Sequence, residues 1–281
     1  MRRTIALVVA LLVAGAVAVG AVAVVRSHSS EAAPPPPPPT APPPKPFRIV
    51  FPEGFTRRQM ADRITAVDAI ALHKRGVRPR LSESAYLKAT AGKTRVPGFG
   101  RTHYRYEGFL FPATYDFFKN TPSKQLVSDQ LDAFQENWAK VNLRYARRKN
   151  LTPYDVLIIA SMIEKEAQAR EERRLVAAVI YNRLHAQMPL GIDATIRYAL
   201  EVPPTESLHE SQLHNPTPYN TRIHRGLPPT PIANPGLASI QAAAHPAKVD
   251  YLYFVRKPDK VHHFFTSSYT AFRNYANAHG Y

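Results

Sequence analysis

The hydrophobic and polar positions of the chain predict one long apolar segment followed by short strands. Residues 4–25 carry no charge and are mostly alanine, valine and leucine. As a helix this segment would span roughly 33 Å, about the thickness of a bilayer core. Apolar residues alternate at 47–51, which predicts a strand. Residues 251–255 and 262–266, separated by a turn, predict a β-hairpin.

Helical patterns occupy most of the chain between these strands. Thr56, with Gln59 three residues later, has the spacing of a capping box at a helix start. Thr152 and Pro153 provide a cap residue and a proline suited to the first helical turn. The mixture of helices and strands predicts an α+β fold. The expected helices cover residues 57–64, 67–74, 82–89, 123–148, 156–169 and 171–185.

The apolar N-terminal segment favours a membrane anchor. Arg2 and Arg3 precede it, and positive charge tends to keep that end of a segment in the cytoplasm. The apolar region of a cleaved signal peptide is usually shorter, about 7–15 residues, so a retained anchor is favoured over a cleaved signal or a buried core helix. We therefore expect a single-pass protein of the cell (inner) membrane, with its folded part outside the cytoplasm.

Composition divides the chain into four parts. Residues 27–46 include six consecutive prolines, which predict an extended polyproline linker. The expected division is therefore residues 1–26 for the cytoplasmic end and transmembrane helix, 27–46 for the linker, 47–100 for a small module and 101–281 for a larger domain.

Charge and cysteine content exclude several classes of protein. The chain has 281 residues, a formal net charge of +16 and no cysteine, which excludes disulfide scaffolds, cysteine zinc sites, iron–sulfur clusters and thiol nucleophiles. Residues 31–154 hold 21 basic and 10 acidic residues, whereas 155–281 hold 13 and 11. The basic excess indicates either a solvated surface or attraction to anionic lipid or carboxylate-bearing polymer. The expected location argues against a nucleic-acid partner.

One carboxylate follows an unusually apolar helix. Residues 156–163 are almost entirely apolar and run directly into Glu164. Burial raises the pKa of a carboxyl group, and a carboxylic acid that stays protonated can act as a general acid. Glu166 lies about 200° further around a helix, so only one of the two can face a given cleft. From these residues alone, a structural glutamate in a salt bridge is the commoner case, and a catalytic acid is the alternative.

Nine short runs follow one another along the chain: Tyr106–Pro112, Ala160–Glu166, Tyr181–Leu184, Asp193–Thr195, Tyr219–Thr221, Gly226–Pro229, Ile232–Gly236, His245–Lys248 and Tyr251–Val255. In this order and spacing they resemble one known family, the endolytic murein transglycosylases (MltG/YceG-like). The resemblance implies that Glu164 is the catalytic acid, with Glu166 as the alternative. It also implies a LysM-like character for residues 47–100 and a transglycosylase catalytic domain at 101–281.

The resemblance implies cleavage of the β-1,4 bond between N-acetylmuramic acid and N-acetylglucosamine without water. The product would carry a 1,6-anhydro end, and the reaction would need no metal and no cofactor. Glycan strands of peptidoglycan would be the substrate, and membrane-bound peptidoglycan synthases are the implied partners. Two rival functions stay open: a hydrolytic muramidase with Asp193 as base, and a non-catalytic wall-binding scaffold.

Polar residues after the expected acid helix are candidate substrate contacts. Arg183 has an internal salt bridge as its alternative, and Asp193 has a polar network or a helix cap. His263 is alternatively structural. The chain departs from the family pattern around Asp193, where a Gln and a Pro are usual, and at Phe272, where a His is often found. The candidates are Asn182, Arg183, Asp193, Thr195, Tyr198, Tyr219, Asn220, Thr221 and His263.

Overall fold

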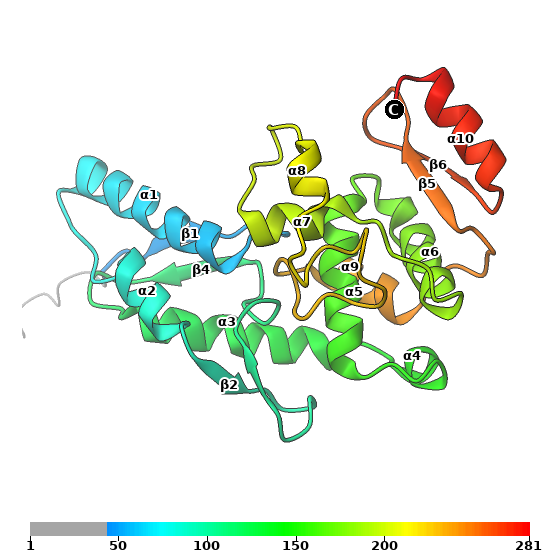
Figure 1. Ribbon diagram of the computed structural model, residues 1–281. Coiled ribbons are helices and arrows are strands. Elements are labelled where there is room, and N and C mark those ends of the chain that lie inside the picture. The colour runs from blue at the N-terminus through cyan, green and yellow to red at the C-terminus, as the bar shows by residue number, and fades with distance from the viewer. Residues whose placement is uncertain (1–43) are drawn as a thin grey trace, which may run out of the picture. The chain divides into compact units, whose positions relative to one another are not determined.

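A computed structural model describes residues 44–281 as one compact unit (Figure 1). The expected transmembrane helix and all but the last three residues of the linker lie outside the described residues and stay predictions. None of the helices in the described part has the length and apolarity needed to cross a bilayer. The helices are α1 (Arg57–Arg75), α2 (Glu83–Ala89), α3 (Ser123–Trp138), α4 (Arg144–Arg148), α5 (Pro153–Glu166), η1 (Arg170–Glu172), α6 (Arg173–His185), α7 (Asp193–Leu200), α8 (Glu210–Leu213), α9 (Leu237–Ala244) and α10 (Tyr269–Ala278).

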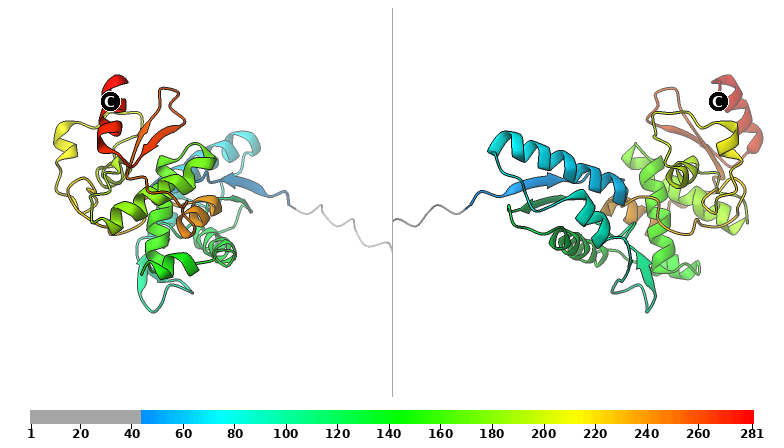
Figure 2. Two further views of the ribbon diagram at one scale, coloured as in Figure 1. Left: turned by 90° about the vertical axis from the view of Figure 1, so that its right-hand side faces the viewer. Right: turned by 60° about the vertical axis from the view of Figure 1, so that its left-hand side comes forward.

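The strands of residues 44–281 form three antiparallel pairs. β1 (Phe47–Val50) pairs with β4 (Thr114–Phe117), and β2 (Lys93–Arg95) pairs with β3 (His103–Arg105). β5 (Tyr253–Arg256) and β6 (His263–Thr266) form the predicted C-terminal hairpin, against which α10 packs. Figure 2 shows this hairpin and α10 at the end of the described unit away from α1 and β1. The expectation of an α+β fold is confirmed, with mostly helices and small sheets.

A smaller hydrophobic core joins the β1–β4 pair to α1, α2 and the first half of α3. Ile49 and Phe117 face inward from the two strands, and Met60 and Tyr86 meet them from the helices. The hydroxyl of Tyr86 donates a hydrogen bond to Gln130 Oε1 (2.8 Å), so the one polar atom at its centre has a partner. Because β4 follows residue 100, this core extends past the expected module boundary. The boundary itself and the LysM-like character stay predictions.

A larger core surrounds α5, the helix that carries the two candidate acids. Every residue of α5 from Val156 to Ile163 is buried, and α6, α7 and α9 pack around the helix. The predicted start is confirmed, because the Thr152 side chain accepts a hydrogen bond from the Asp155 backbone N–H (3.1 Å). Pro153 occupies the first helical turn.

Two expected helices differ from the structure. The stretches predicted at 57–64 and 67–74 form one helix, α1, because no glycine or proline interrupts them before Gly76 ends the helix with φ +61°. The helix predicted at 123–148 is divided into α3 and α4. A turn after Trp138 redirects the chain, so that Leu143 and Ala146 are buried in the larger core.

Candidate active site

A groove of about 1040 Å³ runs between the smaller core and the α5 region. One wall comes from the start of α1 and the segment around Glu107. The other comes from α7, from residues 217–219 and from Arg256 at the end of β5. Lys165 and Glu166, from the last turn of α5, lie between these walls. The groove is larger than a second pocket of about 640 Å³ in the described residues, and residues from both the smaller core region and the α5 region line it.

Glu166 is partly buried and lines the groove. Burial, and after it the negative charge of Asp193, raises the pKa of Glu166 to about 7. The charge of Arg256, the backbone N–H of Ala194 and the charge of Arg197 act in the opposite direction. None of the ion pairs among residues 44–281 includes Glu166. Near neutral pH this carboxyl therefore exists in both protonation states, as a group that gives and takes a proton must.

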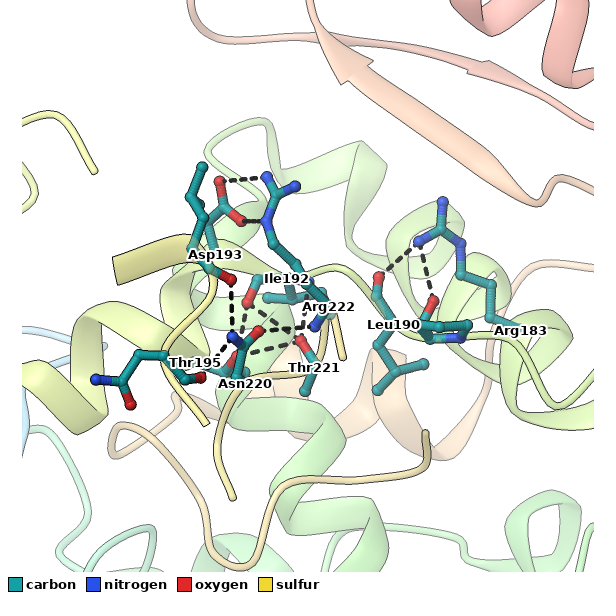
Figure 3. Close-up of polar contacts among 11 residues, drawn as sticks. Arg183, Leu190, Ile192, Asp193, Thr195, Asn220, Thr221 and Arg222 are labelled. Carbon is teal, nitrogen blue, oxygen red and sulfur yellow. Dashed lines mark hydrogen bonds and ion pairs between the residues drawn. The ribbon is translucent and has the colours of Figure 1, made fainter. Parts of the chain in front are cut away.

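Asp193 is held in place beside Glu166 by an arginine. Arg222 donates to both carboxylate oxygens of Asp193, from Nε at 2.6 Å and from Nη2 at 3.0 Å (Figure 3). Beneath this pair, Thr221 Oγ1 accepts from the Ile192 backbone N–H (3.0 Å) and contacts Thr195 Oγ1 (3.1 Å). These bonds fix the start of α7, which explains how Asp193 keeps its position at the groove.

Glu164 lies on the other side of α5 and does not line the groove. Its side chain is 7% exposed, its Oε2 accepts from the Gly236 backbone N–H (3.0 Å), and its Oε1 lies 3.9 Å from Arg173 Nη2. Arg173 Nη2 also lies 3.9 Å from Glu53 Oε2. A side chain at Gly236 would overlap the Glu53 carboxylate, so this packing requires glycine there. The sequence-based expectation placed Glu164 in the cleft, and this position differs from it.

Asn234 connects the turn before α1 to the rest of the molecule. It is fully buried and exchanges backbone hydrogen bonds with Gly54 and Phe55, each 2.9 Å. Its Oδ1 accepts from the Gly108 and Leu110 backbone N–H groups, and its Nδ2 donates to Glu107 Oε1 (2.8 Å). We call residues 52–55, Glu107, Glu164, Arg173 and residues 234–236 the module clamp.

Glu107 is a second carboxylate with a raised pKa, but its oxygens are occupied. Burial raises its pKa to about 7 against the effect of several donors. The Arg57 backbone N–H at the start of α1 donates to it (2.9 Å), as do Asn234 and the Tyr198 hydroxyl (3.2 Å). Glu107 therefore joins α1, α7 and the 234 segment through hydrogen bonds.

The comparison with known families decides the family of this chain. The model of the YceG-like family matches residues 39–278. The chain belongs to the YceG-like family. The family resemblance expected from the sequence is thereby confirmed.

Several relatives of this YceG-like chain have names or structures. A Bacillus subtilis protein named endolytic murein transglycosylase is 38% identical over 151 residues, which cover 54% of this chain and 42% of that protein. A protein of the same name from Streptococcus pneumoniae R6 is 39% identical over 158 residues, covering 54% and 28%. This chain thus matches less than half the length of these relatives. A crystal structure of a putative YceG-like protein from Listeria monocytogenes has a TM-score of 0.67 and 30% identity, covering 83% of this chain and 76% of that chain.

Three of the expected substrate contacts lie at the groove of the YceG-like fold: Asp193, Tyr198 and Tyr219. The rings of Tyr198 and Tyr219 lie 5.4 Å apart. The Tyr219 hydroxyl is hydrogen-bonded to Thr230 Oγ1 (2.8 Å). These two rings give one wall of the groove an aromatic surface of the kind that packs against sugar faces.

The other six expected contacts do not line the groove, and their role as substrate contacts stays a prediction. Thr195, Asn220 and Thr221 are buried, and their side chains bond to nearby backbone or to one another. Arg183 donates to the carbonyl of Leu190 at 2.6 Å (Figure 3). It also donates to the carbonyl of Leu252 at 2.6 Å, and it has no carboxylate partner among residues 44–281.

Asn182 and His263 likewise face away from the groove. Asn182 Nδ2 donates to the carbonyls of Val249 and Tyr251, and it lines a different, shallow pocket. His263 is buried, with its Nδ1 2.7 Å from Glu172 Oε2. Both residues join α6 or η1 to the C-terminal segments.

Sequence reasoning missed Glu107, Arg197 and Arg256 as groove residues. Glu107 lies in the run Tyr106–Pro112, but only the resemblance marked that run, and no local pattern indicates that its carboxylate is buried. Arg197 lies one helical turn after Asp193, so the helical period could have placed both residues on the same side of α7. Nothing in the sequence near Arg256 indicates the groove.

Proposed function

We propose that this protein is an endolytic lytic transglycosylase that cuts peptidoglycan glycan strands, with Glu166 as its catalytic acid. The observation that carries the proposal is a carboxyl group in the groove between the two cores that has a pKa of about 7 and takes part in no ion pair among residues 44–281. Membership of the YceG-like family and the names of the relatives support the substrate class.

The chemistry needs only one carboxyl group. Protonated Glu166 gives its proton to the oxygen between C1 of N-acetylmuramic acid and the neighbouring N-acetylglucosamine, and the C1–O bond breaks. The carboxylate then takes the proton of the 6-hydroxyl on the same muramyl ring while O6 bonds to C1. The products are a 1,6-anhydro end and a free 4-hydroxyl. No water is consumed, and Glu166 ends protonated as it began.

The Asp193–Arg222 pair supports this reaction over the hydrolytic rival. A conventional glycosidase uses a second carboxylate as base or nucleophile. Arg222 bonds to both carboxylate oxygens of Asp193, and this pairing makes Asp193 a weaker base and a weaker nucleophile than an unpaired carboxylate. The role left to Asp193 is electrostatic, because its charge helps to keep the proton on Glu166.

The experiment that tests the proposal compares products from the full chain and two matched variants. Purified strands are digested, and their ends are analysed by mass spectrometry, where an anhydro end is lighter than a reducing end by one water. Wild type is expected to produce anhydro ends. Glu166→Gln is expected to lower the rate by about 10³-fold, a typical contribution of a general acid. Glu164→Gln, on the same helical turn, is expected to keep the product and most of the rate.

Each rival function predicts a different result. Reducing ends from wild type would favour the muramidase, and intact strands would favour the scaffold. Loss of activity in Glu164→Gln with retention in Glu166→Gln would return the acid to the position expected from the sequence.

A further inference from the structure

The groove is lined by more positive than negative charge. Arg58 forms an ion pair with Glu201 at the rim, and Asp193 forms one with Arg222, which comes from outside the groove. The other groove cations, Arg57, Arg105, Lys165, Arg197 and Arg256, appear in no ion pair among residues 44–281. The acids left to balance them are Asp62, Glu107 and Glu166, and the last two have pKa values of about 7. The groove is therefore suited to a substrate that brings negative charge.

Arg256 is the cation at the Glu166 end of the groove. It ends β5 and is exposed, and its side chain makes no hydrogen bond or ion pair with any residue from 44 to 281. It nevertheless lies close enough to Glu166 for its charge to lower the pKa of that carboxyl. An arginine without a protein partner beside a catalytic groove has all five of its donors free for a ligand.

Arg197 lies near the same carboxyl, on α7. Its Nη1 donates to the carbonyls of Pro203 and Glu206, both at 2.8 Å, so two uncharged acceptors hold the guanidinium in place. These bonds use one nitrogen and leave the positive charge without a counter-ion. Its charge also lowers the pKa of Glu166. Arg197 on α7 and Arg256 on β5 thus both lie close enough to the Glu166 carboxyl to lower its pKa.

We propose that Arg197 and Arg256 form a subsite for the carboxylate-bearing substituent of the muramyl sugar at the bond being cut. This inference rests on the proposed function and adds to it. In the glycan, only every second sugar carries such a substituent, either a lactyl carboxylate or a peptide with carboxylates of its own. Guanidinium groups bind carboxylates through charge-assisted and often bidentate hydrogen bonds.

The subsite determines which of the two alternating bonds is cut. A strand shifted by one sugar would place N-acetylglucosamine beside the two arginines and leave their charges unpaired. The correct register places the muramyl C1 and its 6-hydroxyl at Glu166. Electrostatic recognition of the substituent therefore selects the sugar that can form the anhydro product.

The test measures kcat and KM of the full chain on three strand preparations. One carries intact peptides, one is peptide-free with lactyl carboxylates, and one has its carboxylates neutralised by amidation. At a pH below the alkaline limb, Arg256→Gln is expected to lower kcat/KM about tenfold on carboxylate-bearing strands, mainly through KM, and to leave amidated strands unchanged. Arg273→Gln is the matched control, because Arg273 is exposed on α10 and does not line the groove.

The pH profile provides a second readout. Because the charge of Arg256 lowers the pKa of Glu166, its removal is expected to move the alkaline limb of kcat/KM to higher pH. A loss confined to peptide-bearing strands would identify the peptide as the source of the carboxylate. A loss confined to peptide-free strands would identify the lactyl group.

Two results would overturn the subsite: an equal loss on charged and amidated strands, or no loss with an unmoved pH limb. If wild type cuts none of the strands, the proposed function fails. The subsite is then judged separately from the dissociation constants of wild type and Arg256→Gln for charged and amidated strands. Equal constants for the two proteins would overturn it, and weaker binding of charged strands alone would support it.

Discussion

The module clamp and the groove meet at the last turn of α5, and the carboxylates in these two regions differ in their hydrogen bonds and ion pairs. In the clamp, Glu164 accepts from a backbone N–H beside Arg173, and Glu107 accepts from three donors. In the groove, Glu166 takes part in no ion pair with residues 44–281. Glu107 and Glu166 both have pKa values of about 7, so a raised pKa does not by itself identify the acid. What separates them is the number of donors on the carboxyl group: three groups bond to Glu107, whereas among residues 44–281 only one donor, the Ala194 backbone N–H, acts on Glu166.

The largest effect on stability is expected from Glu107→Ala. This change leaves the Arg57 N–H, the Asn234 amide and the Tyr198 hydroxyl without their acceptor. Unpaired buried donors are costly, and we expect a loss of about 3 kcal/mol in the free energy of unfolding, measured by denaturant titration of the full chain. Glu201→Ala, which breaks the exposed pair with Arg58, should cost under about 1 kcal/mol. Equal losses in the two variants would contradict the role of the clamp.

A smaller loss is expected on the other side of the clamp, at Glu164. Glu164→Ala removes the acceptor of the Gly236 N–H and one of the two carboxylates near Arg173, which keeps its hydrogen bond to Ser239 (3.1 Å) and the Glu53 carboxylate at 3.9 Å. We expect it to lower the free energy of unfolding by about 2 kcal/mol.

Glu164→Gln separates the charge of Glu164 from its hydrogen bond, because the amide oxygen can still accept from Gly236. It should recover about half of the loss. If alanine and glutamine are equally destabilising, the charge of Glu164 matters more than its hydrogen bond, and the interpretation of the clamp must change.

The smallest expected effect is the pH dependence of stability at Glu166. In the folded protein its pKa is about 7, against a usual value of 4.5, so the folded state retains a proton that the unfolded chain releases as pH rises above 4.5. Wild type therefore loses stability between pH 4.5 and 7.

Glu166→Gln lacks this loss. A rise in pKa from 4.5 to about 7 corresponds to at most about 3.4 kcal/mol, and solvent screening of the partly exposed Glu166 side chain reduces this. The variant should be more stable than wild type by about 1.5 kcal/mol at pH 8 and equally stable near pH 4, as measured by denaturant titration at both values. Glu107 titrates alike in both proteins and cancels from the difference. A difference that does not change with pH would show that the groove does not hold the proton on Glu166.

The sequence predicted features that depend on nearby residues and missed those that depend on distant contacts. Thr152 caps α5 through a bond to a residue three positions away, and alternation marked β1 and the C-terminal hairpin. β4 was not predicted, because its partner lies more than 60 positions earlier, at Phe47–Val50.

Which of Glu164 and Glu166 lines the groove also depends on contacts with residues that are distant in the sequence. The helix turns the two carboxylates to opposite sides, as the sequence predicts, but α5 is buried all the way from Val156 to Ile163. No apolar stripe marks one side as core and the other as cleft. The decision depends on Gly236 and Arg173 packing on one side and on α7 on the other, and these contacts span up to 72 positions.

The glycine at position 236 has a consequence for the charges around Arg173. The Glu53 carboxylate occupies the volume that a β-carbon at 236 would fill. Glu53 Oε2 also lies 3.9 Å from Arg173 Nη2. An alanine at 236 would turn the half-exposed Glu53 side chain away from Arg173, so the glycine keeps a second carboxylate beside that arginine.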